Sequence, residues 1–409
     1  MRKMKDSGVE WIGEIPKDWN CMRLKFAFGN SNVGESVDKE LYSSDENGYI
    51  FYTAGANPVK TSYTEFPMWK YTTDNDILLA RNGTPYIYLP SKDAVYSDHI
   101  IRINIKDGYC RRFLRYCLQR SIESIIVDSV SIATWSISLW KEQKLPLPYY
   151  HEQKYLADYL DSKCSKIDEI IEKQQAIIKK LKEYKFSIIT EAVTKGINPD
   201  VELKDSTIDM CEQIPVNWGI SQNRYLFLLR DEKNYKPLEE VRLLSLYTDL
   251  GVFPHGEQEE RGNKAVKAEG YKVVYENDIV VNIILAWMGA IGRSAYDGVT
   301  SPAYDIYKPN ENVCSRYYHY LYRTKPFSAE CYKYGRGIMA MRWRTYSSEF
   351  KSIKVPVPPY IEQCQIADYL DSKCEMLDKT IADRNKAIDI LQEYKKSLIY
   401  EVVTGKKEV

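Results

Sequence analysis

The stretch ADYLDSKC occupies residues 157 to 164 and returns unchanged at residues 367 to 374. Aligning the chain with itself at this offset matches residues 145–196 with residues 355–406 without a gap, and about half of the pairs are identical. Identity of this extent predicts a true internal duplication, so the chain is built from two related halves.

Shorter matches extend the repeat toward the start of each half: KDS at 5–7 and 204–206, IPKDW at 15–19 against IPVNW at 214–218, and NDIL at 75–78 against NDIV at 277–280. The halves therefore lie near 1–200 and 201–409. Their helical ends match closely, whereas the parts between share little beyond these short anchors. This contrast predicts that the helical ends perform the same task in both halves, whereas the parts between them perform two different tasks.

Each duplicated segment is predicted to form one long helix. Residues 149–195 contain neither Pro nor Gly, and a coiled-coil-like stripe with steps of three and four is formed by Ile167, Ile170, Gln174, Ile177, Leu181, Tyr184 and Ile188. The second copy offers a looser stripe of Ile381, Ile388, Leu391, Leu398 and Val402. A helix over 151–194 would be about 65 Å long. Because each helix must bury its stripe, we expect the two to pack antiparallel around a pseudo-twofold axis.

The remaining parts read as mixed α and β structure. Short apolar runs separated by Gly, Asn and Asp turns predict strands, for example HIIRINI at 99–105 and KVVYENDIVVNIILAW at 272–287, and each half has one helical stretch, near 110–126 and 315–334. The predicted fold class is α+β, with two globular domains in tandem joined by two long antiparallel helices. The predicted boundaries are 1–148 for the first domain, 149–196 for the first helix, 197–358 for the second domain and 359–409 for the second helix.

The charge of the whole chain is balanced, with 57 Lys and Arg against 57 Asp and Glu. Locally it is not: residues 81–120 carry eight basic side chains against three Asp, and residues 316–354 carry nine against two Glu. Aromatic residues interleave with the arginines there. Such segments favour contact with nucleic acid, although a single arginine is more often a solvated surface charge.

Arg can donate twice to a guanine edge, Asn can do the same at adenine, and Lys or Tyr can reach phosphates. The candidate DNA-contacting residues are Arg81, Asn82, Thr84, Tyr86, Tyr88 and Lys92 in the first domain and Asn282, Trp287, Arg293, Arg336, Arg342 and Arg344 in the second. Trp287 is equally compatible with core packing.

The sequence lacks the motifs of several enzyme classes. It contains no phosphate-binding GxxxxGK[ST] loop, no HExxH, no GxSxG, and no glycine-rich cofactor loop with the tetrapeptide of a base methyltransferase. The nine cysteines show no metal spacing, and Cys164 and Cys374 are expected to be small buried residues. No membrane span or secretory leader is apparent, so we expect a cytoplasmic, non-catalytic recognition protein without a cofactor or metal of its own.

The chain resembles the specificity subunit of type I restriction-modification systems. The resemblance rests on LPLPYYHEQ and VPVPPYIEQ before the two ADYLDSKC copies, on GEIPKDW and EQIPVNW, on NDILLARNG, and on the segment DIVVNIILAWMGAIGRSAYDGVTSPAYDIY, and it covers essentially the full length. It implies two target-recognition domains that each read one half of a bipartite, asymmetric double-stranded DNA sequence, with paired helices setting the gap.

The resemblance also implies partners. Two modification subunits would use S-adenosylmethionine to methylate adenine, and restriction subunits would use ATP and Mg²⁺ to translocate and cleave DNA. The matching helix starts would dock the two modification subunits, with Glu152, Gln153, Tyr159, Glu362, Gln363 and Tyr369 as candidates, although helix capping and packing account for them nearly as well. A structural adaptor, whose helices join protein partners and whose basic stretches are incidental, is the alternative from another functional class.

Overall fold

The computed structural model describes residues 2–43, 48–126, 134–248, 250–256, 268–337 and 343–409. The chain forms two compact units, one made of residues 1–175 with 385–409 and the other of residues 176–384. Both units take in part of each long helix, whereas the predicted boundaries place each helix in a segment of its own. Each unit is described by itself.

The first unit is built around a four-stranded sheet in the order β4 (Phe28–Val33), β11 (Ile100–Ile105), β8 (Asp76–Ala80) and β9 (Ile87–Tyr88), with antiparallel neighbours. Every residue of β8 is buried, which explains why Asp76 is followed by the uninterrupted apolar run ILLA. Helix α1 (Arg111–Ile126) packs on this sheet through fully buried residues such as Phe113 and Leu114. The sequence thus places its apolar runs at the centre of the domain.

The other elements of the first domain are β1 (Met4–Asp6), β2 (Glu14–Pro16), β3 (Asn20–Arg23), β5 (Tyr42–Ser43), β6 (Tyr49–Tyr52), β7 (Val59–Thr61), β10 (Val95–Tyr96), α2 (Ile137–Lys141) and β12 (Lys144–Leu147), with short 3-10 turns η1 (Leu24–Phe26), η2 (Lys39–Leu41) and η3 (Met68–Lys70). Strands β10, β6, β7 and β5 form a second sheet, and β12 pairs with β3 just before the long helix begins. That pairing joins the end of the domain to its start.

The second unit repeats the framework. Its main sheet has the order β16 (Phe227–Arg230), β23 (Tyr304–Pro309), β20 (Ile279–Asn282) and β21 (Ile291–Arg293), again with antiparallel neighbours. Strand β20 occupies the place of β8, as NDIV and NDIL predict. The two globular parts share far more structure than sequence, because strand pairing needs buried apolar residues in register and tolerates many different ones.

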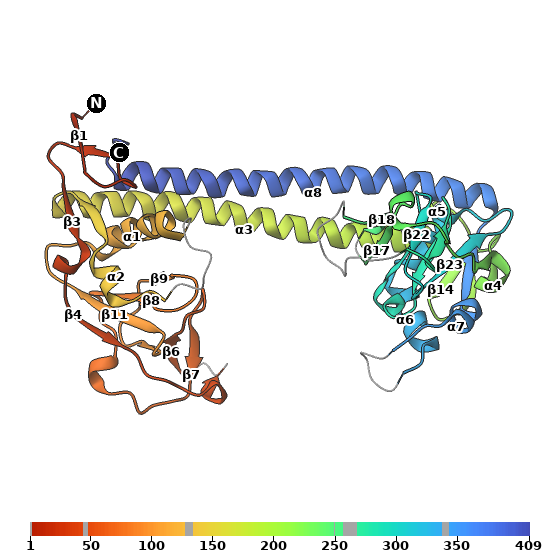
Figure 1. Ribbon diagram of the computed structural model, residues 1–409, viewed down its shortest axis with the longest axis horizontal. Coiled ribbons are helices and arrows are strands. Elements are labelled where there is room, and N and C mark those ends of the chain that lie inside the picture. The colour runs from red at the N-terminus through yellow and green to blue at the C-terminus, as the bar shows by residue number, and fades with distance from the viewer. Residues whose placement is uncertain (1, 44–47, 127–133, 249, 257–267, 338–342) are drawn as a thin grey trace. The chain divides into compact units, whose positions relative to one another are not determined.

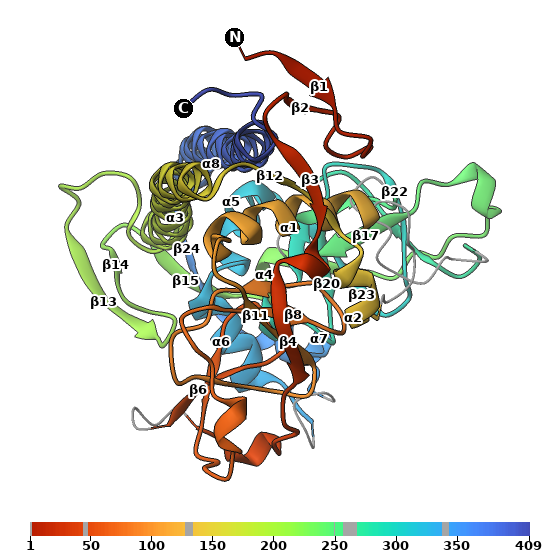
Figure 2. The same ribbon diagram turned by 90° about the vertical axis from the view of Figure 1, so that its left-hand side faces the viewer.

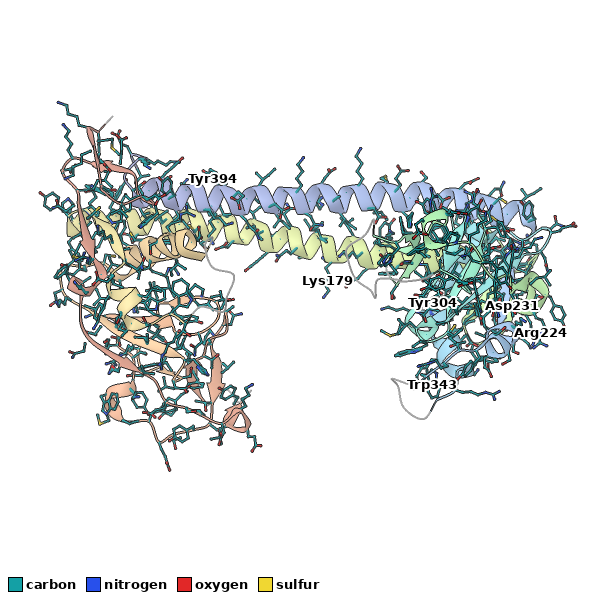
Figure 3. All side chains as sticks on the ribbon, viewed as in Figure 1. Lys179, Arg224, Asp231, Tyr304, Trp343 and Tyr394 are labelled. Carbon is teal, nitrogen blue, oxygen red and sulfur yellow. The ribbon has the colours of Figure 1, made fainter. Side chains whose placement is uncertain are left out.

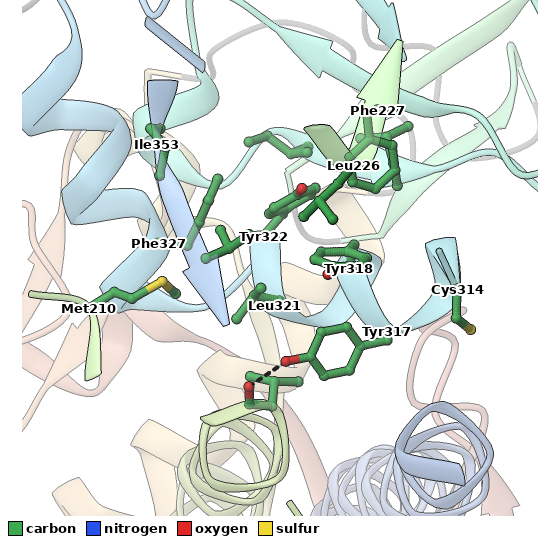
Figure 4. Packing of buried hydrophobic residues seen from close by; sticks show 14 of the residues in the cluster. Met210, Leu226, Phe227, Cys314, Tyr317, Tyr318, Leu321, Tyr322, Phe327 and Ile353 are labelled. Carbon is green, nitrogen blue, oxygen red and sulfur yellow. Dashed lines mark hydrogen bonds between the residues drawn. The ribbon is translucent and has the colours of Figure 1, made fainter. Parts of the chain in front are cut away.

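The remaining elements of the second domain are β13 (Leu203–Ile208), β14 (Cys211–Pro215), β15 (Gly219–Gln222), α4 (Asn223–Leu226), η4 (Leu238–Glu240), β17 (Leu244–Tyr247), β18 (Gly251–Pro254), β19 (Lys272–Val274), η5 (Ala286–Met288), β22 (Gly298–Thr300), α5 (Ser315–Tyr322), α6 (Lys325–Tyr334), α7 (Ser347–Ser352) and β24 (Lys354–Val357). Its core is rich in aromatic rings, with Tyr318 and Tyr322 close to Phe227 and Phe327 (Figure 4). The hydroxyl of buried Tyr317 donates to the Val193 carbonyl at 2.8 Å, which ties the domain to the long helix (Figure 4).

The long helices are α3 (Tyr150–Lys195) and α8 (Tyr360–Val403). Within the first unit, Lys395 of α8 bonds Asp168 of α3 at 2.6 Å, and within the second unit Lys185 of α3 bonds Asp378 of α8 at 2.6 Å. The two ion pairs join repeat-equivalent residues with the helices exchanged. The helices therefore run antiparallel along their shared face (Figures 1 and 2), which confirms the predicted pairing.

The buried stripe of α3 follows steps of four and three but differs in part from the predicted one. Ile167 is buried as expected, whereas Ile170 and Tyr184 are 44% and 58% exposed, and Ile171 and Ile178 are buried instead. Apolar residues occur in adjacent pairs here, so both phases fit the pattern, and contact with α8 selects the phase that continues from Cys164. In α8, the predicted Ile381, Ile388, Leu398 and Val402 are all buried.

The nine cysteines are free, and Cys164 and Cys374 are buried at equivalent points of the two stripes, as predicted. None of the described helices combines the length and apolar character that a membrane span requires.

Each domain is anchored to the start of its long helix by the same contacts. The amide oxygen of buried Gln153 accepts from the Cys110 N–H at 2.9 Å while its nitrogen donates to the Pro148 carbonyl at 2.9 Å, and Gln363 repeats both bonds with Cys314 and Pro358 at 2.9 and 2.8 Å. These residues satisfy backbone groups that are otherwise buried without partners.

An arginine on the first helix of each domain adds charge to this anchor. Arg112 contacts Asp158 and Asp161, both at 2.6 Å, and Arg316 contacts the equivalent Asp368 and Asp371, both at 2.8 Å. The carboxylate pairs raise the pKa of both guanidinium groups above its ordinary value, against the effect of burial. The Asp pairs lie within the duplicated ADYLD, so each copy of the repeat supplies the carboxylates that bind an arginine of its domain.

The IPxxW motifs close the opposite ends of the helices. The chain turns away just after helix α8 at Gly405 (φ 70°), where an added Cβ would lie 2.5 Å from Pro16, and buried Trp19 packs beside it. It turns in the same way just after helix α3 at Gly196 (φ 80°), next to buried Trp218. Each hairpin at the start of a half thus covers the end of a long helix.

One half-buried histidine links α5 to the main sheet of the second domain. The Arg293 N–H donates to Nδ1 of His319 at 3.1 Å, so this nitrogen must be unprotonated. Burial, with the nearby charges of Arg323 and Arg293, lowers the pKa of His319 to about 3.

Replacing Gln153 or Gln363 by Leu removes two hydrogen bonds and leaves a buried N–H and a buried C=O unpaired. We expect each variant to lose about 1–3 kcal/mol of unfolding free energy per unpaired group. Urea unfolding followed by circular dichroism measures this, with the exposed Gln365→Leu as the matched control. Equal unfolding midpoints for Gln363→Leu and Gln365→Leu would contradict the anchoring role.

His319 is expected to make stability depend on acid. Its folded pKa lies below the unfolded value, so the unfolded chain binds more protons below about pH 6.5 and the unfolding free energy falls toward pH 3, by at most about 1.4 kcal/mol per pH unit. His319→Asn should lose this contribution and show a shallower dependence than the wild type, whereas the exposed His151→Asn should not. Urea titrations between pH 7 and pH 4 test the difference, and identical slopes for His319→Asn and wild type would refute it.

Candidate nucleic-acid interface

The turn between β8 and β9 holds the first group of predicted contacts. Arg81 and Thr84 are exposed on this turn, with Gly83 at φ 71° between them. The amide nitrogen of half-buried Asn82 lies 2.9 Å from Nδ1 of His99, and the Arg81 N–H donates to the His99 carbonyl at 2.8 Å. The turn is thus fixed to the start of β11 and presents one guanidinium and one hydroxyl to solvent.

The other three predicted residues of the first domain are placed differently. Tyr88 is buried, and its hydroxyl donates to the Thr53 and Gly55 carbonyls at 3.0 and 2.5 Å, so the structure gives it a packing role in place of the predicted contact. Tyr86 is half-buried and lines a cavity of about 650 Å³ together with Arg115, Cys164 and Lys395. Lys92 is exposed.

Much of the basic excess of residues 81–120 is engaged in contacts within the protein. Most of these side chains bind groups of the protein itself: Arg102 lies 3.7 Å from Asp76, Lys106 donates to the Phe26 carbonyl, Arg111 to the Asp76 and Pro90 carbonyls, Arg112 to Asp158 and Asp161, and Arg120 to Glu123. Counting charges along the sequence therefore overstated the charge available to DNA in this segment.

In the second domain, the equivalent turn after β20 is apolar. Asn282 is 7% exposed, and its Oδ1 accepts from the Ile284 N–H at 3.0 Å, so it shapes the turn instead of reading a base. Trp287 is half-buried, with Nε1 donating to the Ile284 carbonyl at 3.1 Å.

Beside this turn lies a group of aromatic rings, here called the aromatic platform, formed by Trp287, Tyr332 and Trp343. Tyr332 stacks on Trp343 with ring centroids 4.8 Å apart and planes at 21°, and it meets Trp287 at 5.9 Å. Gly335 makes this possible, because an added Cβ would lie 2.5 Å from Nε1 of Trp343. Trp343 belongs to the margin of the second domain (Figure 3). Tyr332 and Trp343 were not singled out from sequence, although both stand among the arginines of YKYGRGIMAMRWRTY.

Two of the predicted arginines stand next to the platform. The backbones of Arg336 and Arg344 exchange hydrogen bonds of 2.8 and 2.9 Å, and Nε of Arg336 lies 2.9 Å from the carboxylate of buried Glu349 while its side chain is 78% exposed. Nη1 of Arg344 donates to the Trp343 carbonyl at 2.8 Å. Arg342 lies outside the described residues.

Arg293 is placed away from this group. Strand pairing sets it opposite Ile279 at the start of β20, and its guanidinium bonds Asn277 at 2.8 Å and Glu276 at 3.2 Å with 20% exposure. It stabilises the edge of the sheet through these bonds, so its position does not support the prediction that it contacts DNA.

The predicted partner-facing residues lie at the starts of the long helices, where the Gln and Tyr pairs repeat their environments and the Glu pair does not. Glu152 bonds Arg2 at 2.5 Å and Trp19 at 3.1 Å, and Glu362 bonds Asn217 at 3.2 Å. Gln153 and Gln363 are 1% exposed, so the anchoring bonds described above replace the predicted partner contact. Capping and packing were the alternatives left open for them.

Tyr159 and Tyr369 are half-buried, each with a lysine ammonium over its ring at 5.7 and 5.8 Å. The exposed apolar side chains at the helix starts, which sequence reasoning did not select, are Tyr149, Tyr150 and Tyr155 on one helix and Tyr360 and Ile361 on the other. The two starts thus share an inner framework and differ in their outer residues.

Comparison with known proteins supports a single family. The model for the type I restriction modification DNA specificity domain matches residues 16–191. The chain is 25% identical over 439 residues to the putative type I restriction enzyme MjaX specificity subunit of Methanocaldococcus jannaschii, covering 97% of this chain and 96% of that protein. It is 23% identical over 428 residues to the MjaVIII specificity subunit of the same organism, with 97% and 94% covered.

A solved chain from work on the complex assembly and conformational transition of the type I R-M system has the same fold, with a TM-score of 0.68 at 12% identity over 96% of this chain and 99% of that one. The repeat, the family model and the full-length relatives all point to one family, the specificity subunits of type I restriction-modification systems.

Proposed function

We propose that the two domains read the two halves of a bipartite, asymmetric DNA sequence, and that the chain directs adenine methylation and cleavage by partner subunits. The observation that carries this proposal is the division between framework and surface. Both domains have the same sheet order and the same Gln and Arg anchors, yet they present unlike residues where the turns after β8 and β20 meet solvent. A shared framework with different surfaces fits two readers of different sequences.

The chemistry of each surface suits base readout. In the first domain, Arg81, Asn82 and Thr84 combine a guanidinium, an amide and a hydroxyl on a turn that is tied to β11. In the second domain, Arg336 and Arg344 lie beside the aromatic platform. These groups match the donor and acceptor patterns of the major groove, while lysines such as Lys92 suit phosphates.

The chain supplies recognition, and its partners supply chemistry. Two modification subunits would bind at the starts of α3 and α8, and their S-adenosylmethionine would methylate an adenine that is flipped out of the duplex. Restriction subunits would bring ATP and Mg²⁺ for translocation and cleavage. Such a complex acts on chromosomal and invading DNA, which places it in the cytoplasm.

Exchanging residues 20–145 for the corresponding part of another specificity subunit should change one half of the methylated sequence and leave the other half and the gap unchanged. Long-read sequencing of methylated adenines in cells that carry the complex reports both halves at once. The complex that contains the original chain, without the exchange, is the control. A change in both halves, or methylation without a defined sequence, would argue against independent readers, and the latter result is what a structural adaptor would give.

The helices are proposed to set the gap between the half-sites. Inserting seven residues after Ala176 and after Lys386, which are repeat-equivalent positions, keeps the apolar stripes in phase and lengthens each helix by about 10 Å. We expect methylation at the original spacing to be lost and a gap longer by about three base pairs to replace it. The exposed Lys179→Gln on α3 (Figure 3) should leave the gap unchanged. Retention of the original spacing after both insertions would refute this role.

A further inference from the structure

Arg336 is exposed to solvent and is also held by a buried carboxylate. Its side chain is 78% exposed, yet Nε is held 2.9 Å from Oε1 of Glu349, whose side chain is only 7% exposed. A second group fixes the carboxylate, because the Ser348 hydroxyl donates to its other oxygen at 2.7 Å. The guanidinium is therefore held at one edge while the opposite edge faces solvent.

The backbone beneath Arg336 is fixed as well. Its N–H donates to the Arg344 carbonyl at 2.8 Å, and the Arg344 N–H donates back at 2.9 Å. The next residue, Thr345, is buried, with its N–H donating to the Ile283 carbonyl at 2.9 Å and its hydroxyl to the Cys331 carbonyl at 3.0 Å. These bonds leave Arg336 little freedom in its backbone or along its side chain.

Such an arrangement suits base readout better than phosphate contact. A long, mobile arginine can follow a phosphate, but a guanine edge requires two donors at one orientation. Holding Nε in advance leaves the two terminal nitrogens as that pair and lowers the entropic cost of ordering the side chain on binding. Burying the Glu349 carboxylate costs free energy, and that cost would bring no benefit if Arg336 contacted only solvent.

The carboxylate of this pair has no counterpart at the aligned position of the first domain. Helices α7 and α2 align at the offset of the helical ends of the repeat, and Glu349 corresponds there to Leu139. The shared framework therefore does not require the pair. A residue pair added at a surface where the domains differ fits a role in telling one half-site from the other.

We propose that Arg336 reads a guanine in the half-site of the second domain, with Glu349 as the residue that positions it. This inference rests on the proposed function and specifies the chemistry of one of its two readers. Arg336 would donate from both terminal nitrogens to O6 and N7 of the guanine, and Glu349 would act only through Arg336.

The experiment uses the full chain with its modification and restriction partners, and determines the methylated motif by long-read sequencing in cells. Arg336→Lys keeps the charge but lacks the fork, so preference for guanine at one position of one half-site should fall about ten- to a hundredfold. Glu349→Gln, which keeps the shape but removes the charge, should reduce preference at that same position to a smaller degree. The other half-site should be unchanged in both variants, which also shows that the complex still assembles.

Arg224→Lys is the matched control, since Arg224 is exposed on the same domain and bonds only the Ser352 hydroxyl at 2.8 Å among the described residues. It should leave the motif intact. If Arg336→Lys and Glu349→Gln lower methylation uniformly without changing any base preference, the pair is a structural link and the inference is wrong, while the proposed function stands. If the wild-type complex methylates no defined sequence, the proposed function fails and the inference with it.

Discussion

The burial of one apolar stripe on each long helix is the constraint on which the rest of the structure depends. A helix of this length exposes far too much apolar surface to remain alone, and the duplication supplies a second helix with the same stripe. The ion pairs Asp168–Lys395 and Asp378–Lys185 show how one sequence serves both sides, since each helix contributes the acid in one unit and the base in the other. In an antiparallel pair, two copies of one segment can form the same contact twice, once near each end.

The same logic explains why the domains share their attachment and differ at their surfaces. Gln153 and Gln363, together with Arg112 and Arg316, bond repeat-equivalent groups, so a change in any of them would cost a buried hydrogen bond or an ion pair. The turns after β8 and β20 are under no such constraint. The turn after β8 carries Arg81 and Asn82, whereas the turn after β20 contributes Trp287 to the aromatic platform, and the sheet order beneath them is the same.

Charge has two uses in this chain. Most of the basic residues between 81 and 120 bind backbone carbonyls or carboxylates within their own domain, which is consistent with a chain whose total charge is balanced. Within that segment, Arg81 and Lys92 are left exposed on the surface. Recognition in the proposed complex then depends on a small number of well-placed donors, and partner subunits would contribute much of the general affinity for phosphates.

The sequence by itself determined the duplication, the two long helices, their antiparallel pairing, the α+β class and the family, because these depend on identity, periodicity and length, which are local or repeated properties. It did not determine the phase of the α3 stripe, since adjacent isoleucines at 170 and 171 fit either choice and only contact with α8 decides between them.

Nor could the sequence distinguish candidate residues that are available to contact DNA from those that stabilise the domain. Gln153, Tyr88, Asn282 and Arg293 have the side-chain chemistry of a contact residue, but the fold turns each of them toward a partner within the protein. Glu349 showed no signal at all until folding brought it to Arg336. Burial and long-range partners are set by the packing of distant segments, and so only the tertiary structure decided which charges stay available.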